Sequence, residues 1–373
     1  MSAKSLSKHA PDALLLLAVL AITLFGMMMI TSASSVIAER FRGDIYSFLK
    51  HQLFFGGGAG LLALAVGFIV PYQRWRILAL PGLLVTIGLL VCVFIPGLQF
   101  EYGGAARWIH FGPITLQPTE IAKIAFILYL AALLERKGED VRDFSKGVLP
   151  FLIIIGVLGG LIVLQPDIGT LFSIIMIAGA MVFAAGFRLF HLGVIAASGA
   201  ALFFVLFNTA SYRLSRILVY LHPELDPQGI GYQINQALLA VGTGGIFGLG
   251  FGRSRQKYHY LPEPAGDSIF AIIAEELGFI RSSLVILLFV FIGWRGFLIA
   301  KKAPDVFGQL LAAGITSWIL VQAFINMGAI LALTPLTGIP LPFISYGGTS
   351  LVSMLFAIGI LLNISRSTIE KPA

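Results

Sequence analysis

GIGYQINQALLAVGTGGIFGLGFGRSRQKYHYLPEPAGDSIFAIIAEELG, residues 229–278, decides the fold, because it is glycine-rich and polar inside a chain that is otherwise apolar. Its charges include the acids Asp267, Glu275 and Glu276 and the cations Arg253, Arg255 and Lys257. Membrane proteins rarely keep this much polar material unless it lines a cavity or a site. We therefore expect the chemistry of the protein in this stretch.

Composition places the chain in a membrane. Of its 373 residues, 58% are hydrophobic and 12% are charged, whereas soluble domains are about half apolar and a quarter charged. The net charge of +7 is spread over short loops, which argues against a nucleic-acid partner. Cys92 is the only cysteine, so an intramolecular disulfide is excluded.

Apolar runs of roughly 20 residues predict the spans, since that length crosses about 30 Å of hydrocarbon. We expect an all-α polytopic membrane protein in which residues 1–373 form one integral membrane domain with ten transmembrane helices. The predicted spans are 11–33, 52–70, 77–96, 119–134, 148–165, 168–187, 189–207, 283–300, 306–333 and 345–364.

Lysine and arginine in the short connections set the orientation. The connection after the fourth span carries Arg136, Lys137, Arg142 and Lys146, so it is expected in the cytoplasm together with both termini. Residues 208–282, between the seventh and eighth spans, then form a large extracytoplasmic loop. Its apolar stretches 234–241 and 269–277 predict short helices in this loop.

Asp267 is the candidate catalytic residue. It stands just before an apolar helical run, so one interpretation is a helix N-cap. The other is a general base in an outward, partly desolvated cavity, where a positioned carboxylate contributes typically 10²–10⁴-fold in rate. Glu275 follows at a helical spacing that lets it share this cavity, while Glu276 faces away and is expected to pair with another helix or with headgroup cations.

A second group of candidates lies in GGAARWIHFGPITLQPTEIAK, residues 103–123. Arg107 lies in an outer loop, and Glu120 and Lys123 share one helix face. They form either an internal ion pair or, with Arg107 and with Lys257 of the long loop, a site for a phosphate-bearing lipid. Both interpretations stay open.

The segment TPLTGIPLPFISYGGTS, residues 334–350, is rich in proline and glycine and precedes the last span. Ser345, Gly347 and Gly348 either cradle an anion at a helix N-terminus or allow tight helix packing. Asp167 of QPDIGT is expected to cap the sixth span. Gln322 and Asn326 share a face of the ninth span and are expected to hydrogen-bond between helices.

Several motifs in this order resemble the SEDS family of cell-wall proteins, which includes FtsW, RodA and SpoVE, and more closely its division branch, FtsW. The departures are Gly266 and Ser268 beside Asp267, and Arg281, which we expect to snorkel or to pair with Glu275 or Glu276. The matching motifs are ARWI, QPTEIAK, QPDIGT, GYQINQALLAVGTGG, GLGFGRSRQK, YLPEPAGDSIFAIIAEELG and PLPFISYGGTS.

The resemblance implies a peptidoglycan glycosyltransferase of the cytoplasmic (inner) membrane that polymerises lipid II on the outer face, with Asp267 at the position of the family's essential aspartate. It also implies a class B penicillin-binding protein as partner, alongside other proteins of the division or elongation machinery. A divalent cation such as Mg²⁺ or Mn²⁺ is an optional cofactor, and no organic cofactor is expected. A lipid II flippase and a non-catalytic scaffold of the division machinery remain alternatives.

Overall fold

The computed structural model describes residues 9–102, 105–111, 114–138, 140, 143, 147–188, 190–191, 193–195, 197–201 and 218–368. Helices dominate it. They are α1 (Ala13–Arg42), α2 (Ser47–His51), the π-helix η1 (Gln52–Gly58), α3 (Ala59–Ile69), α4 (Tyr72–Cys92), α5 (Pro118–Lys137), α6 (Leu149–Leu164), α7 (Ile168–Ala184), the 3₁₀-helix η4 (Pro223–Leu225), α10 (Ile230–Gly244), α11 (Ile269–Lys302), α12 (Val306–Ile330) and α13 (Gly348–Ser365).

Six of the described helices are long and apolar enough to cross a membrane, namely α1, the continuous run Ser47–Ile69, α4, α11, α12 and α13. The helices α6 and α7 are apolar but shorter. Every predicted span except 189–207 overlaps one of the helices above, and nine of the 19 residues of 189–207 lie outside the described residues. The membrane character of the chain is therefore confirmed, while the count of ten spans stays a prediction.

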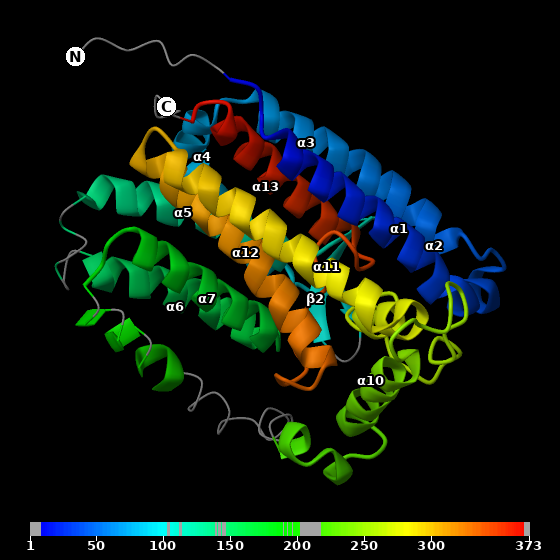
Figure 1. Cartoon of the computed structure of the whole chain (residues 1–373). Helices are drawn as coiled ribbons and strands as arrows, with labels where there is room; N and C mark the ends of the chain where they lie inside the picture. The colour runs from blue at the N-terminus through cyan, green and yellow to red at the C-terminus, as the bar shows by residue number, and fades with distance from the viewer. Residues whose placement is uncertain are drawn as a thin grey trace.

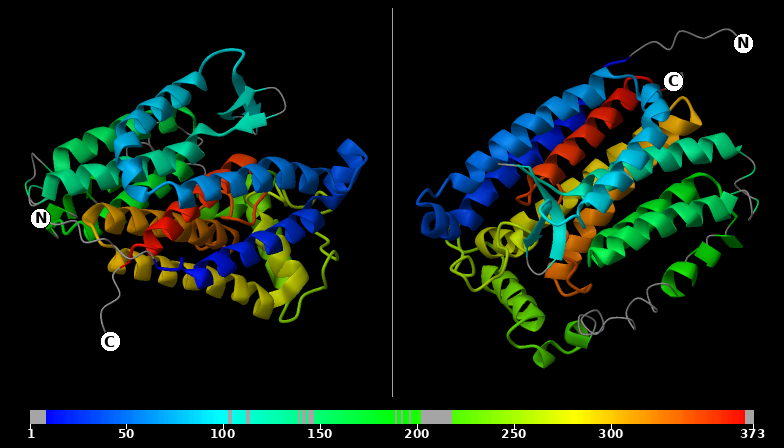
Figure 2. Two further views of the ribbon diagram at one scale, coloured as in Figure 1. Left: turned by 90° about the horizontal axis from the view of Figure 1, so that it is seen from above. Right: turned by 180° about the vertical axis from the view of Figure 1, so that it is seen from behind.

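The start of α1 and the end of α13 lie at the same end of the helix bundle (Figures 1 and 2). The backbone N–H of His9 donates to the carbonyl of Arg366 at 2.9 Å, and Arg295 of α11 pairs with Asp12 at 2.6 Å. Helix α10 and the loop that leads from it to α11 lie at the opposite end (Figure 1). The stretch that the sequence singled out thus lies at the end of the bundle opposite to the start of α1 and the end of α13.

A small antiparallel sheet corrects the expectation of an all-α fold. Its strands β1 (Gln99–Tyr102), β2 (Ala105–Phe111) and β3 (Ile114–Leu116) are ordered β1-β2-β3, and Ile109 of β2 pairs with Gln99 on one side and Leu116 on the other. Residues 93–117 are too short and too polar to span, so their backbone groups pair with each other instead. Thr349 of α13 donates to the Thr115 carbonyl, which anchors the sheet to the bundle.

Both predicted short helices of the long loop are present. Residues 234–241 lie in α10, and 269–277 form the first part of α11, which is bent at Gly278 with φ 75°. Gly278 lies against the backbone of Phe247 and Gly248, where a Cβ atom would come within 2.2 Å of the Gly248 nitrogen. Only glycine combines this φ with such close approach, so the kink is encoded locally.

Candidate functional site

Asp267 lies in a tight turn directly before α11. The backbone N–H groups of Gly266 and Ser268 both donate to the Glu263 carbonyl, at 3.0 and 3.2 Å. Ser268 occupies the N-cap position of α11, so the interpretation of Asp267 as the N-cap is wrong. The side chain of Asp267 is half-buried, which is the partly desolvated setting expected for a base.

Three contacts fix the backbone on both sides of this carboxylate. The Asn326 side-chain amide on α12 donates to the Asp267 carbonyl at 2.7 Å and to the Ile339 carbonyl at 2.8 Å. The Ser345 hydroxyl donates to the Gly266 carbonyl at 2.7 Å, and the Tyr346 N–H donates to the Ala265 carbonyl at 2.8 Å. The Asp267 turn is therefore pinned to α12 and to the 334–346 segment, which we call the proline segment.

The proline segment also bounds the space beside the Asp267 carboxylate. Gly338 has φ 67°, a conformation that favours glycine, and a Cβ atom there would lie 3.7 Å from Asp267 Oδ2, so this residue lies directly beside the carboxylate. Within the described part of the chain, Asn326 Oδ1 and Thr337 Oγ1 are buried and have no hydrogen-bond partner. Other buried side-chain atoms elsewhere in the described residues also lack a partner, so these two do not by themselves mark a ligand site.

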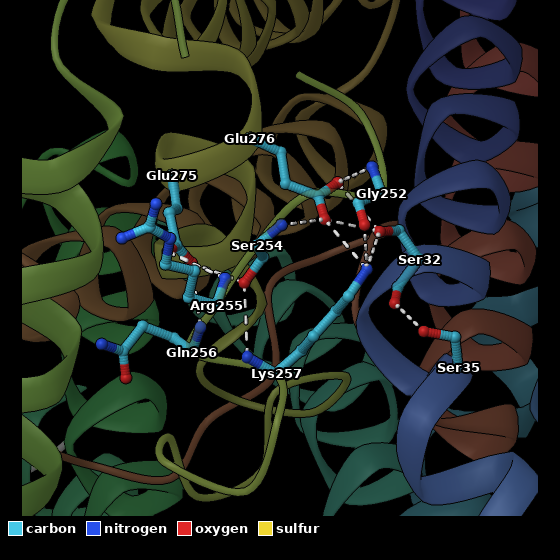
Figure 3. Close-up of polar contacts among 9 residues, drawn as sticks. All are labelled: Ser32, Ser35, Gly252, Ser254, Arg255, Gln256, Lys257, Glu275 and Glu276. Carbon is cyan, nitrogen blue, oxygen red and sulfur yellow. Dashed lines mark hydrogen bonds and ion pairs between the residues drawn. The ribbon is translucent and has the colours of Figure 1, made fainter. Parts of the chain in front are cut away.

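Glu276 is the centre of a buried acid cluster that we define as Ser32, Ser254, Lys257, Glu275 and Glu276 (Figure 3). Its carboxylate accepts from Ser32 Oγ at 2.6 and 2.9 Å, from the N–H groups of Gly252 and Ser254 at 3.0 and 3.1 Å, and from Lys257 Nζ at 3.4 Å. Because Ser32 belongs to α1, the prediction that Glu276 pairs with another helix is confirmed.

Glu275 holds the same loop from its other side. It accepts the Ser254 hydroxyl and the N–H groups of Arg255 and Gln256, at 3.0 and 3.4 Å for the two N–H groups. The side chains of Glu275 and Lys257 are 1% and 4% exposed. The predicted substrate-binding role of Glu275 and Lys257 therefore stays a prediction, and this geometry favours a structural role for both.

Lys123 lies in a second buried cluster between α5 and α12. Its ammonium group donates to Glu120 and, at 2.7 Å, to Gln322 Oε1, and it lies 5.3 Å from the Trp318 ring centroid. Both Lys123 and Glu120 are 1% exposed. The internal ion pair that the sequence left open is thus present, and a direct contact of this pair with a lipid phosphate is disfavoured.

The Lys123 cluster reaches the proline segment through Gln322. The Gln322 amide donates to the Pro340 carbonyl at 3.0 Å, one turn of α12 before Asn326 binds the Ile339 carbonyl. Gln322 of α12 also accepts from Lys123 of α5, so the expected hydrogen bond between helices is confirmed for Gln322, whereas Asn326 binds backbone carbonyls outside the helices. One polar face of α12 therefore binds the proline segment at the successive residues Ile339 and Pro340.

Arg107 lies on β2, and its hydrogen-bond partners differ from those of Lys123. Its guanidinium donates to the carbonyl oxygens of Gln165 and Pro166, at the turn between α6 and α7. The Asp167 carboxylate caps α7 as predicted, accepting from the Thr170 N–H at 3.2 Å and from its hydroxyl at 2.8 Å. Arg107 is half-buried and anchors the sheet, so a joint phosphate site of Arg107 and Lys123 is not formed in this conformation.

The start of α13 packs tightly against the π-helix. The Gly347 N–H donates to the buried Gln52 Oε1 at 3.1 Å, and a Cβ at Gly348 would lie 3.9 Å from the backbone of Phe55 and Gly56. This contact favours the packing interpretation of Gly347 and Gly348 over the anion cradle. Arg281 is exposed at α11 and donates to the Phe247 carbonyl at 3.2 Å, so the expected pairing with Glu275 or Glu276 is wrong.

Metal ligands are sparse around Asp267. Among the described residues, no group of three or more His, Cys, Asp or Glu side chains is placed to hold a metal ion. Mg²⁺ is usually bound by one or two carboxylates together with substrate phosphates, so Asp267 fits such an ion only when phosphate oxygens complete the set.

Residues 12–370 match the model of the family described as "Cell cycle protein", which comprises FtsW, RodA and SpoVE. The chain belongs to this family. It is 44% identical over 362 residues to stage V sporulation protein E of Bacillus subtilis (strain 168), covering 96% of this chain and 98% of that relative. It is also 44% identical over 356 residues to the probable peptidoglycan glycosyltransferase FtsW of Trichlorobacter lovleyi, covering 95% and 93%.

Solved structures of the FtsW/RodA/SpoVE family share the fold. A chain from a peptidoglycan synthase complex, solved to show how polymerization and crosslinking are coordinated, superposes with a TM-score of 0.79 at 27% identity, covering 96% of this chain and 98% of that one. The rod shape determining protein RodA of Thermus thermophilus superposes with a TM-score of 0.70 at 27% identity, covering 97% and 99%. The resemblance expected from the motifs is therefore confirmed over nearly the whole chain.

Proposed function

We propose that the protein is a peptidoglycan glycosyltransferase that polymerises lipid II into glycan strands on the outer face of the cytoplasmic membrane. The observation that carries the proposal is the Asp267 turn, whose backbone is fixed by Asn326, Ser345 and Tyr346 and whose carboxylate lies next to Gly338. Relatives at 44% and 43% identity that are named probable peptidoglycan glycosyltransferase FtsW support the same activity.

Asp267 acts as the general base in this proposal. Its carboxylate takes the proton from the 4-hydroxyl of the acceptor's N-acetylglucosamine while that oxygen forms a bond to the anomeric carbon of the donor sugar. The bond from the anomeric carbon to the pyrophosphate oxygen breaks, and undecaprenyl pyrophosphate leaves with the electron pair. A single displacement inverts the anomeric configuration. Fixing the backbone on both sides of Asp267 maintains the geometry that such a transfer needs.

The leaving pyrophosphate needs positive charge nearby. Arg253 and Arg255 are exposed on the loop that the acid cluster holds, which makes them better placed for a phosphate than the buried Lys123. A divalent cation, if used, would be held by Asp267 together with phosphate oxygens of the substrate, and it would neutralise charge on the leaving group. We propose no step that depends on it.

We further propose ten spans with both termini in the cytoplasm and residues 208–282 outside. The separation of the chain ends from the Asp267 turn along the bundle supports this arrangement (Figure 1). A class B penicillin-binding protein as the crosslinking partner is supported by the structural similarity to a chain of a synthase complex. A role in cell division, with other proteins of the division machinery, is supported by the FtsW relatives.

The decisive experiment uses Asp267→Asn, purified with its partner transpeptidase and supplied with lipid II. We expect glycan polymer on gels to fall at least about 10²-fold, because the amide cannot accept the proton. The matched control is Asp44→Asn at the α1–α2 turn, where a hydrogen bond from Lys50 lowers the pKa of an exposed aspartate. Undiminished polymer from a folded Asp267→Asn protein would refute the assignment.

A further inference from the structure

A cavity lies between the start of α4 and the end of α5, at the end of the bundle where α1 begins and α13 ends. Its volume is about 530 Å³. Two facing stripes line it. One comprises Arg76, Ala79 and Leu80 of α4, and the other comprises Tyr129, Ala132, Leu133, Glu135 and Arg136 of α5.

The cavity is charged at its mouth and apolar farther in. Arg76 stands in the second turn of α4, and Glu135 and Arg136 stand in the last turn of α5, at the same end of the two antiparallel helices. At about 1.5 Å per residue, Tyr129 lies about 10 Å deeper than Arg136 along α5. The charged mouth would face the headgroup of a bound lipid at the membrane surface, and the apolar part of the cavity would face its acyl chain in the bilayer.

The charges at the mouth sum to one positive charge. Arg76 Nη1 contacts both carboxylate oxygens of Glu135, at 3.0 and 2.9 Å, while 57% of the Arg76 side chain stays exposed. An exposed pair of this kind contributes little to stability, so Arg76 can share its remaining donors with a ligand. Arg136 is also exposed and lines the same mouth. Two guanidinium groups at one opening suit the bidentate binding of a phosphate.

We propose that this cavity binds an anionic phospholipid, with its phosphate held by Arg76 and Arg136 and one acyl chain lying along Leu80, Ala132 and Leu133. Basic pockets between transmembrane helices on the cytoplasmic side are suited to anionic headgroups, because that leaflet carries the anionic lipids. The site is distinct from the Asp267 turn, which lies at the opposite end of the bundle, and the inference does not depend on the glycosyltransferase assignment.

Native mass spectrometry of the full purified chain tests the proposal, with phosphatidylglycerol and phosphatidylcholine of identical acyl chains as probes. We expect the wild-type protein to retain phosphatidylglycerol several-fold better than phosphatidylcholine. The double variant Arg76→Gln/Arg136→Gln should lose at least about tenfold in apparent affinity for phosphatidylglycerol, which corresponds to about 1.4 kcal/mol.

The control is Arg74→Gln/Lys137→Gln, which removes two charges at neighbouring positions that do not line the cavity. We expect this control to bind phosphatidylglycerol like the wild type. Equal losses in both double variants, or equal retention of the two lipids by the wild type, would overturn the proposal. Displacement of the lipid by millimolar inorganic phosphate would do the same, because it would indicate a general phosphate site.

A filling variant tests the cavity without changing its charge. Ala132→Trp places an indole between the two stripes and should lower phosphatidylglycerol binding severalfold while the thermal unfolding temperature stays near that of the wild type. The Ala132→Trp variant still tests the proposal if Arg76→Gln/Arg136→Gln does not fold. Unchanged lipid binding by a folded Ala132→Trp protein would contradict the assignment.

Discussion

Asn326 positions the Asp267 carboxylate by binding the backbone beside it. Its amide group holds the Asp267 and Ile339 carbonyl oxygens at 2.7 and 2.8 Å, so one residue of α12 fixes two loops against each other. The residue is 3% exposed, and water does not easily replace the bonds that it makes. Asn326 is therefore a positioning residue for the carboxylate of Asp267.

We expect Asn326→Ala to lower the rate of lipid II polymerisation by about 10²-fold, because small displacements of a catalytic group have effects of that size. The stability cost should be about 1–3 kcal/mol, since two buried carbonyl groups lose their donors. Polymer formation and thermal unfolding are measured on the same preparation.

The control for Asn326→Ala is Asn363→Ala on α13. Asn363 is also buried, donates to the Phe68 carbonyl at 2.6 Å and accepts from the Tyr72 N–H at 2.9 Å, in the half of the bundle that carries the chain ends. The Asn363→Ala protein should lose about as much stability as Asn326→Ala but polymerise lipid II at the wild-type rate. Equal loss of turnover in the two variants would show that Asn326 acts only on stability.

The sequence predicted Asp267 and missed what holds it. Asp167 was recognised as a cap because its partner Thr170 is three residues away, within one helical turn. The Asn326 contact with Asp267 spans 59 positions, and the Ser32 contact with Glu276 spans 244. Local periodicity carries no information on such pairs, because tertiary packing decides which helix faces meet.

At the scale of elements, the kink in α11 separates the segment after Asp267 from the membrane-spanning part of the helix. Gly278 makes the kink, and the carbonyl groups of Glu275 and Glu276 just before it accept the N–H groups of Leu249 and Gly250, at 3.0 and 2.9 Å. The helix thereby uses its own backbone to hold the loop that precedes the Asp267 turn.

Gly278→Ala should destabilise the protein by roughly 3 kcal/mol or more, because a left-handed residue costs about 1–2 kcal/mol and the new Cβ also collides with the Gly248 backbone. Gly245→Ala is the matched variant: φ is 54°, and no heavy atom lies within 4 Å of the added Cβ. Gly245→Ala should lose only the stability that an alanine at positive φ costs, without a steric collision. Thermal unfolding in detergent compares the two, and equal shifts would mean that the close backbone approach is not stabilising.

Which elements the sequence could predict depended on their length. Long apolar runs predicted the membrane-spanning helices, and the apolar stretch 269–277 predicted the first part of α11. The small sheet was missed, because β1 and β3 have only four and three residues and their pairing depends on a turn rather than on alternation. The π-helix η1 also lacked a signal, since its hydrogen-bond register depends on how Gln52 and Gly56 pack against α13.

At the scale of the whole molecule, the bundle has two chemically different ends. One end carries the chain ends and the basic cavity, and the other carries α10, the acid cluster and the Asp267 turn (Figures 1 and 3). Lysine and arginine in the short connections predict which end faces the cytoplasm. The two ends can therefore be assigned to compartments by labelling.

In a Cys92→Ala background, a cysteine at Tyr258, which is 58% exposed, should react with a membrane-impermeant maleimide in intact cells. A cysteine at Lys302, exposed at the other end, should react only after the membrane is permeabilised. The opposite pattern would invert the proposed orientation, and with it the outward placement of Asp267.

The pairing of His9 with Arg366 has a practical consequence for studies in cells. Fluorescent reporters joined to the two termini would be tethered to neighbouring residues of one molecule, through the eight residues before His9 and the seven after Arg366. Energy transfer between them should therefore be efficient within a single copy, and its loss would report unfolding of the bundle without any assay of wall synthesis.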